Sequence, residues 1–220
     1  MPKVTPEHRA ARRQHILEAA MRRVAIDGYH KMTMADVIAE SDLSAGAVYG
    51  YFRSKDELIT AVALQVSGLA RSVVEDILTL DPMPDPPEVL RRLTQTFVDA
   101  VETSPVDLSR VIVTTWGEAV RSPEVRDIVR DEFRGVRARF VDVLDAVQAA
   151  GHLDPEVDTT AAAQALFGMM PGFMLQRLVL QDVDPDTYSE GLRALLGGSP
   201  GAGDARAISV STPRVPTSAG

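Results

Sequence analysis

Residues 33–51 read TMADVIAESDLSAGAVYGY and contain two short helical patterns separated by three residues. Thr33 precedes the first pattern and Asp36 follows three residues later, which is the spacing of a capping box. Residues 41–43 form the connecting turn, and Ser44 is placed to cap the second short helix. This order is typical of a helix-turn-helix, whose second helix enters the DNA major groove. An ordinary αα-hairpin in a helical bundle has the same periodicity, so the pattern alone leaves both structures open.

The sequence on both sides of this motif also has helical periodicity. Apolar residues predict a helix over residues 7–27 that ends at Gly28, and a long helix over residues 54–80 that is capped by Ser54. Further helical segments are expected at about 88–103, 106–121, 124–150, 158–181 and 185–197. Proline or glycine residues mark the breaks between these segments. No segment has the pattern of a strand, so the fold class is all-α.

Composition limits the class of protein. Apolar residues make up 45% and charged residues 25% of the 220 residues, which is typical of a globular chain. Cysteine is absent, which excludes disulfides, thiolate metal sites and a cysteine nucleophile. There is no apolar run approaching ~20 residues and no secretory signal pattern, so we expect a soluble, cytoplasmic protein without membrane contact.

Charge is distributed unevenly along the chain. The formal net charge is −8, yet residues 1–60 contain nine Lys/Arg and eight Asp/Glu. The excess of acidic residues therefore follows residue 60, which suggests two parts with different partners. Arg9, Arg12 and Arg13 form either a solvated basic face or a contact with DNA. Arg22 and Arg23 are interpreted as plain surface residues.

Residues 13–62 closely resemble the DNA-binding domain of the TetR (tetracycline repressor) family of transcriptional regulators. The elements in register are Ile16-Leu17-x-Ala19-Ala20, Gly28, Thr33-x-x-x-Val37-Ile38-Ala39, Leu43-Ser44-x-Gly46-x-x-Tyr49-x-Tyr51-Phe52 and Lys55-x-x-Leu58. The resemblance implies a three-helix DNA-binding domain over residues 9–69 and a larger helical domain for ligand binding and dimerisation over residues 70–197. Residues 198–220 are rich in Gly, Ser and Pro and are expected to be a disordered tail.

Chemistry and the resemblance together indicate the residues that contact DNA. These are Thr33, Met34, Ser44, Ala45, Gly46, Ala47, Tyr49, Tyr51 and Lys55. Small side chains at 45–47 permit close backbone approach and contact with a thymine methyl group, and Lys55 meets a phosphate as a point charge. For Tyr49 a second interpretation is open, a ring partly buried in the hairpin core. Few long side chains are available to read bases, so we expect specificity to depend on Tyr49, Tyr51 and DNA shape.

The C-terminal helices concentrate large, adaptable side chains. They are Phe97, Trp116, Phe133, Phe140, Phe167, Met169, Met170, Phe173 and Met174. Any one of them is explained by ordinary core packing, whereas the resemblance implies a ligand cavity among them. We expect a mainly apolar effector and choose as its pocket Phe97, Trp116, Glu118, Met169, Met170 and Phe173. Glu118 is the acidic candidate, with surface exposure as its alternative. The resemblance also implies a homodimer through the helices near 124–150 and 158–181.

Other classes of function have little support in the sequence. The four histidines show no spacing for metal binding alongside carboxylates, and no nucleophile elbow or phosphate-binding glycine loop is present. We therefore predict no catalytic residues, no metal and no cofactor. The leading hypothesis is a dimeric transcriptional regulator, most directly a repressor, that binds a palindromic operator and is released by a small effector. The alternative is a helical ligand-binding or interaction protein whose hairpin has lost DNA binding, because residues 45–47 and 50 are small.

Overall fold

A computed structural model describes residues 5–197 as helices joined by short connections, with no strand in that range. The predicted all-α fold is confirmed, and each expected helix is present with its ends shifted by a few residues. The helices are α1 (Pro6–Lys31), α2 (Met34–Ser41), α3 (Ala45–Tyr49), α4 (Lys55–Leu78), α5 (Pro86–Thr103), α6 (Leu108–Arg121), α7 (Pro123–Ala149), α8 (Thr159–Val179) and α9 (Pro185–Gly197). The predicted tail, residues 198–220, lies outside the described residues.

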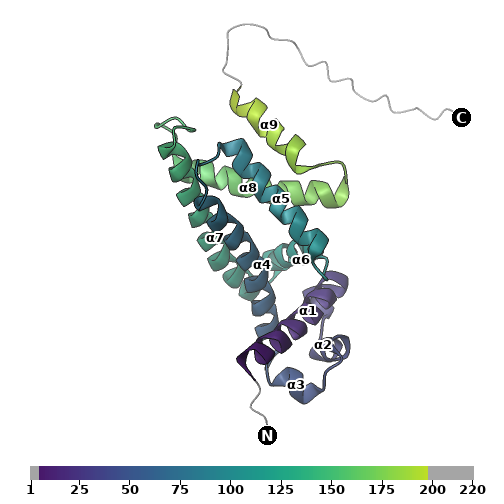
Figure 1. Ribbon diagram of the computed structural model, residues 1–220. Helices are drawn as coiled ribbons and strands as arrows, with labels where there is room; N and C mark the ends of the chain where they lie inside the picture. Colours follow the sequence, from purple (N-terminus) through teal and green to yellow (C-terminus); the bar gives the residue numbers. More distant parts are fainter. Residues whose placement is uncertain (1–4, 198–220) are drawn as a thin grey trace, which may run out of the picture.

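The helices form an elongated molecule with the short helices at one end (Figure 1). There α1, α2 and α3 lie together, and α4 leads away from them alongside α7. At the opposite end α9 packs against α5, while α6 lies between α1 and α7. Because α4 continues through the expected domain boundary between residues 69 and 70, the two parts share one continuous helix.

The core at the α1 end continues into the C-terminal helices. One cluster of buried residues combines Ile16, Val24, Val37, Val48 and Phe52 with Val111 of α6 and Val125 of α7. A second cluster joins α4, α5, α7 and α8, and a third lies among α5, α6 and α8. The burial of α6 residues in the first cluster means that a shift of α6 disturbs the packing of α1.

The first part of α1 ends at Gly28, as the sequence predicts, because Gly28 has a non-helical conformation with a positive φ of 74°. A short helical turn that the sequence did not predict follows as far as Lys31. Only glycine adopts this conformation without strain. The change of direction places the Tyr29 side chain in the core, where its hydroxyl lies 2.8 Å from the Thr115 hydroxyl of α6.

By length and composition, α4 is the one helix among the described residues that is able to cross a membrane. Nearly half of its most apolar window is buried within the chain. Val62 contributes to the first core cluster and Val74 to the second. Parts of α4 therefore belong to the core of the described chain.

Burial raises the pKa of Tyr29 to about 12, with a further contribution from the nearby Glu118 carboxylate, while the hydrogen bond with Thr115 acts in the opposite direction. In the unfolded chain a tyrosine ionises near pH 10. Below pH 10, Tyr29 is protonated in both states and the unfolding free energy keeps its full value. As the pH rises from 10 to about 12, Tyr29 ionises only in the unfolded chain, and the unfolding free energy falls by about 1.4 kcal/mol per pH unit. We expect Tyr29→Phe to remove about 2–3 kcal/mol of the fall in unfolding free energy over this range.

Urea unfolding at a series of alkaline pH values measures this effect. Tyr49→Phe is the control, because Tyr49 is exposed and its loss leaves the alkaline fall unchanged. Equal slopes for wild type and Tyr29→Phe between pH 10 and pH 12 contradict the assignment.

Candidate DNA-binding surface and effector cavity

The capping interactions of α2 and α3 are those predicted from the sequence. The Thr33 hydroxyl donates to Asp36 Oδ2 at 2.7 Å and accepts from the Asp36 amide at 3.2 Å, and the Thr33 amide donates to the same carboxylate. These bonds lower the pKa of Asp36, so the carboxylate stays ionised. The Ser44 hydroxyl accepts from the Ala47 amide at 3.3 Å. Both caps fix where the short helices begin. They also engage the hydroxyl groups of Thr33 and Ser44 in hydrogen bonds within the protein.

The turn between α2 and α3 is connected to α1 by side chains. Asp42 has the left-handed φ of 53°, which a short polar residue tolerates in a turn. His15 Nε2 lies 2.8 Å from the Ser41 carbonyl oxygen, and Arg22 Nε donates to Glu40 at 2.8 Å. The prediction that Arg22 is a plain surface residue is wrong, since it joins α1 to α2. Arg23 is likewise paired, with Asp27 one turn along α1.

A second contact connects α1 to the α3–α4 turn. The guanidinium carbon of Arg13 lies 5.0 Å from the centre of the Phe52 ring, within the range of a cation–π interaction. Phe52 is buried in the core below it. Arg13 therefore orients the turn that precedes α4, in addition to adding positive charge near α3.

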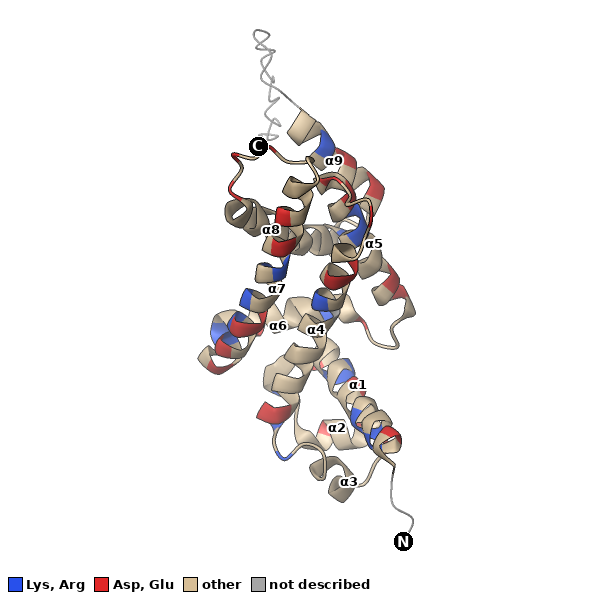
Figure 2. Cartoon of the chain, turned by 60° about the vertical axis from the view of Figure 1, so that its left-hand side comes forward, with Lys and Arg blue, Asp and Glu red and all other residues tan. Residues whose placement is uncertain are grey.

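The side chains that α3 and its cap expose near the start of the helix are small and uncharged (Figure 2). Ser44, Ala45 and Gly46 are exposed, and Ala47 is half-buried. The Tyr49 side chain is 47% exposed, so the partly buried ring is that of Tyr51, which packs against the first core cluster. The interpretation of Tyr49 as a core residue is therefore wrong.

The other two candidates at this end have interactions of their own. Met34 is half-buried and packs against the first core cluster, so α2 presents the Met34 backbone more than its side chain. Lys55 Nζ donates to the His30 carbonyl oxygen at 3.2 Å. This bond joins the start of α4 to the end of α1.

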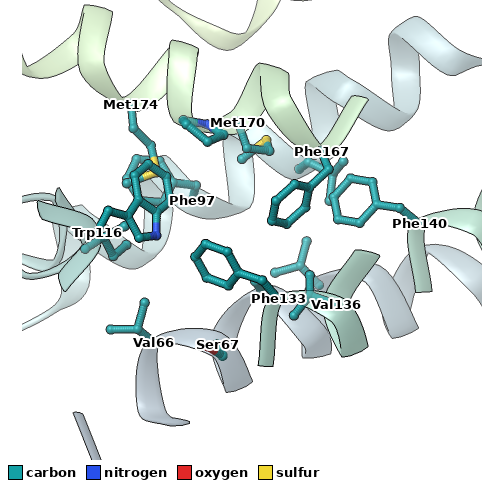
Figure 3. Close-up of a pocket in the computed structure, with 15 residues that line it drawn as sticks. Val66, Ser67, Phe97, Trp116, Phe133, Val136, Phe140, Phe167, Met170 and Met174 are labelled. Carbon is teal, nitrogen blue, oxygen red and sulfur yellow. The ribbon is translucent and has the colours of Figure 1, made fainter. Parts of the chain in front are cut away.

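A cavity of about 100 Å³ lies among α4, α5, α6, α7 and α8 (Figure 3). Three of the six candidate pocket residues line it, namely Phe97, Trp116 and Met170. Sequence reasoning did not identify the side of the cavity that α4 forms. The full lining adds Val66, Ser67, Ala70, Val73, Leu93, Ile112, Phe133, Val136, Phe140, Phe167, Pro171 and Met174. The rings meet edge to face, with 5.9 Å between the centroids of Trp116 and Phe133 and 5.5 Å between Phe133 and Phe167.

The other three candidates lie elsewhere. Phe173 is fully buried but packs between Phe97 and Tyr188, behind the cavity wall. Met169 packs in the second core cluster, and its carbonyl oxygen accepts from the Tyr188 hydroxyl at 2.9 Å. Glu118 is neither in the cavity nor on the surface, since it is 8% exposed and lies 3.2 Å from His30 Nε2. Two residues of α-helix turn the side chain by about 200°, so Glu118 points away from the face that carries Trp116.

These placements give α6 two functional faces. Ile112 and Trp116 line the cavity, whereas Thr115 and Glu118 contact Tyr29 and His30 at the end of α1. The His30 carbonyl oxygen in turn accepts from Lys55 at the start of α4. Direct contacts therefore connect α6, which lines the cavity, with the helices that hold α3.

Comparison with known proteins agrees with this architecture. The family described as "BetI-type transcriptional repressor, C-terminal" matches residues 86–198, and the family described as "Bacterial regulatory proteins, tetR family" matches residues 16–62. The chain belongs to the TetR family. It is a helix-turn-helix transcriptional regulator, as the sequence resemblance implied.

Relatives of this TetR-family chain match either most of its length or a shorter part of it. The regulator UidR of Escherichia coli K12 is 25% identical over 199 residues, which cover 84% of this chain and 91% of UidR. The repressor Rv1474c of Mycobacterium tuberculosis is 44% identical over 63 residues, 29% of this chain and 34% of its own. Among solved structures, the SmeT–triclosan complex superposes with a TM-score of 0.70 at 22% identity, covering 84% of this chain and 91% of SmeT.

Family membership also bears on the other classes of function. TetR-family regulators bind DNA and small molecules, act as dimers and are typically not enzymes. Bacterial members are soluble and cytoplasmic, and the packing of α4 as a core helix agrees with this. The described residues contain no group of three or more His, Asp or Glu side chains placed to bind a metal ion.

Proposed function

We propose that this TetR-family regulator is a repressor that binds a palindromic operator as a homodimer and is released by a small, mainly apolar effector. The observation that carries the proposal is the two-faced α6, which lines an apolar cavity on one side and contacts α1 on the other. We further propose residues 9–69 as the DNA-binding unit and residues 70–197 as the sensing and dimerising unit, with α4 common to both.

The proposed DNA contacts follow from what α2, α3 and α4 expose. Ser44, Ala45 and Gly46 bring backbone close to the bases, and Ala47 adds an apolar contact with a thymine methyl group. Tyr49 extends its exposed ring to the DNA, while the half-buried Tyr51 presents its hydroxyl to a phosphate. At the start of α2, where the Thr33 hydroxyl is engaged in its cap, the phosphate is met by the backbone amides that begin with Met34. When DNA binds, the Lys55 ammonium group leaves the His30 carbonyl oxygen and contacts a phosphate instead.

The cavity supports an uncharged, apolar effector. None of its 15 lining residues is charged, so an ionised ligand there has no counterion. Arg177, the nearest candidate for such a role on α8, pairs with Glu102 at 3.1 Å instead. Triclosan in the SmeT complex is a ligand of this apolar kind. The cavity is smaller than the ~300 Å³ or more of typical ligand sites, so a larger effector displaces a wall to enter.

Exposed apolar residues on α8 support the dimer interface. Leu175 and Val179 are 53% and 68% exposed, and they continue a face of small exposed residues at Ala161, Ala165 and Gly168. On the neighbouring helix α7, Gly135 and Ala138 are also exposed. Small residues allow close helix approach, so a second copy packed across a two-fold axis covers both faces. This arrangement separates the two α3 helices to match successive major grooves, roughly 34–36 Å apart.

DNA binding is tested on the DNA flanking the regulator's own gene. We expect footprint protection of a palindrome. The slope of log K against log salt is expected to be about −0.9 for each phosphate neutralised.

Lys55→Ala weakens binding to all sequences and reduces the size of that slope by about one, whereas Tyr49→Ala narrows the difference in affinity between operator and random DNA. Arg134→Ala on α7 is the control for loss of positive charge. A flat salt response, or no palindrome enriched from random DNA, favours the alternative of a helical binding protein that does not bind DNA.

Filling the cavity from α4 tests the coupling through α6. Ser67 lines the cavity from α4 and is buried. Ser67→Trp adds a side chain that is too large for the free space, so we expect it to displace α6 and weaken operator binding by about fivefold or more. Ser67→Val fits within the cavity and leaves operator affinity unchanged. Ala149→Trp, at the exposed end of α7, controls for the bulk of the ring. If Ser67→Trp folds as a dimer and binds the operator like wild type, α6 does not transmit the signal.

The dimer interface is tested with a matched pair of exposed valines. Val179→Glu places a charge in the proposed interface and is expected to shift the protein to monomers in light scattering, with loss of tight operator binding. Val120→Glu on α6 alters a residue that is 80% exposed but outside the interface, and leaves the dimer intact. A dimer that survives Val179→Glu but not Val120→Glu places the interface elsewhere.

A further inference from the structure

A second space adjoins the cavity on the side of α1. This cleft has a volume of about 230 Å³ and lies among α1, α4, α6 and the end of α5 with the α5–α6 connection. Val66 of α4 and Ile112 of α6 line both the cleft and the cavity, and they are the two residues that the linings share. Figure 3 shows Val66 at the end of the cavity away from Phe140. Two aliphatic side chains therefore lie between the cavity and the cleft.

The cleft differs from the cavity in its chemistry. Its lining consists of Gln14, Glu18, Met21, Gln65, Val66, Ala100, Thr103, Ser104, Pro105, Val106, Leu108 and Ile112. No charged residue lines the cavity, whereas Glu18 of α1 places one carboxylate in the cleft. The two spaces together change from apolar at the cavity to polar and negatively charged at the cleft.

Glu18 is half-buried and forms no ion pair with a described residue. One turn earlier on α1, Gln14 Nε2 donates to Glu18 Oε1 at 3.1 Å. One turn later, Arg22 pairs with Glu40 at 2.8 Å and is not available to Glu18. Charges that are partly removed from solvent are screened less than exposed ones. The cleft is therefore suited to a positively charged group.

We propose that the cavity and the cleft form one binding site for a cationic amphiphile. Its apolar chain occupies the cavity, and its ammonium group stays outside the cavity beside Glu18. The proposal rests on the proposed role of the cavity as the effector site and names the chemistry of that effector. The volumes of about 100 Å³ and 230 Å³ together reach the ~300 Å³ of typical ligand sites, which the cavity alone does not.

The connection between the two spaces depends on the separation of α4 and α6. Val66 and Ile112 are β-branched, and such side chains have one strongly preferred rotamer in a helix. A displacement of α6 therefore opens the connection more readily than a rotation of either side chain. A molecule that fills both spaces holds α6 in its displaced position, and its charged end contacts α1 directly.

The two linings argue against other classes of ligand. Neither contains Lys or Arg, so a carboxylate or phosphate loses its hydration without gaining a counterion and is repelled by Glu18. A neutral molecule fits the cavity but leaves Glu18 without a counterion. An ammonium group gains the ion pair that the neutral molecule lacks.

Octylammonium, octanol and octanoate test the proposal, because they share one alkyl chain and differ in the charge of its end. Trp116 is the only tryptophan in the chain and lines the cavity, so its fluorescence reports entry of the alkyl chain. We expect octylammonium to bind most tightly and to weaken operator binding. Glu18→Gln keeps the shape of the side chain and lowers the affinity for octylammonium by about fivefold relative to octanol. Glu75→Gln, at an exposed position of α4 outside both linings, controls for net charge and leaves that ratio unchanged.

Stopped-flow fluorescence tests the connection between the two spaces. Val66→Ala widens the connection, and we expect octylammonium to associate about fivefold faster. Val136→Ala removes the same atoms from the α7 side of the cavity, away from the cleft, and leaves the association rate unchanged. Equal rates for wild type and Val66→Ala show that the ligand does not pass between Val66 and Ile112, and they overturn the joined site.

The outcomes separate this proposal from the proposed function. If octylammonium and octanol bind but Glu18→Gln leaves their affinity ratio unchanged, the cleft does not hold the charge, and this proposal alone is overturned. Binding of octylammonium in calorimetry without a change in Trp116 fluorescence places the chain outside the cavity and has the same consequence. If none of the three compounds changes Trp116 fluorescence in protein that binds its operator, the cavity does not admit the chain, and the proposed effector site fails as well.

Discussion

The hydrogen bond between Tyr29 and Thr115 is the contact on which the proposed coupling of the two ends depends. It joins the last turn of α1 to α6 at 2.8 Å within a core that excludes water. The bond forms only because Gly28 turns the chain through a positive φ, which directs Tyr29 inward. Since α1 is attached to α2 by Arg22 and to the following turns by His15 and Arg13, the orientation of α3 depends on where α6 holds the end of α1.

The two-faced character of α6 is a consequence of helical geometry. Successive residues turn by about 100°, so Trp116 and Ile112 share one face while Thr115 and Glu118 point toward α1. Both faces of this 14-residue helix therefore contact different neighbours. The continuous first core cluster, which includes Val111 beside the residues of α1, strengthens this connection.

The sequence predicted the local features well and the long-range ones less well. Caps at Thr33 and Ser44 depend on residues three positions apart, so spacing alone is sufficient to find them. The cavity depends on which helices meet, and the sequence identified Phe97, Trp116 and Met170 but not Ser67 or the rest of the α4 wall. Phe173 was misplaced because a buried aromatic residue has the same sequence pattern whether its ring lines the cavity or packs behind the residues that line it. Glu118 was misplaced because its partner, His30, is 88 residues away and comes near only after Gly28 redirects α1.

The size of the cavity links ligand binding to the movement of α6. A space of about 100 Å³ is below the ~150 Å³ of an engineered cavity that binds benzene, so a ring compound enters only if a wall gives way. The α4 and α7 walls lie against each other along much of their length, and moving them disturbs two core clusters. On its far side, α6 is held to α1 by one buried hydrogen bond, by the contact between Glu118 and His30, and by the packing of Val111 in the first core cluster. A buried hydrogen bond contributes about 1 kcal/mol, and allosteric coupling energies are typically about 1–3 kcal/mol. The polar contacts are thus of the size that an effector offsets, which supports α6 as the wall that moves in the proposed release of the operator.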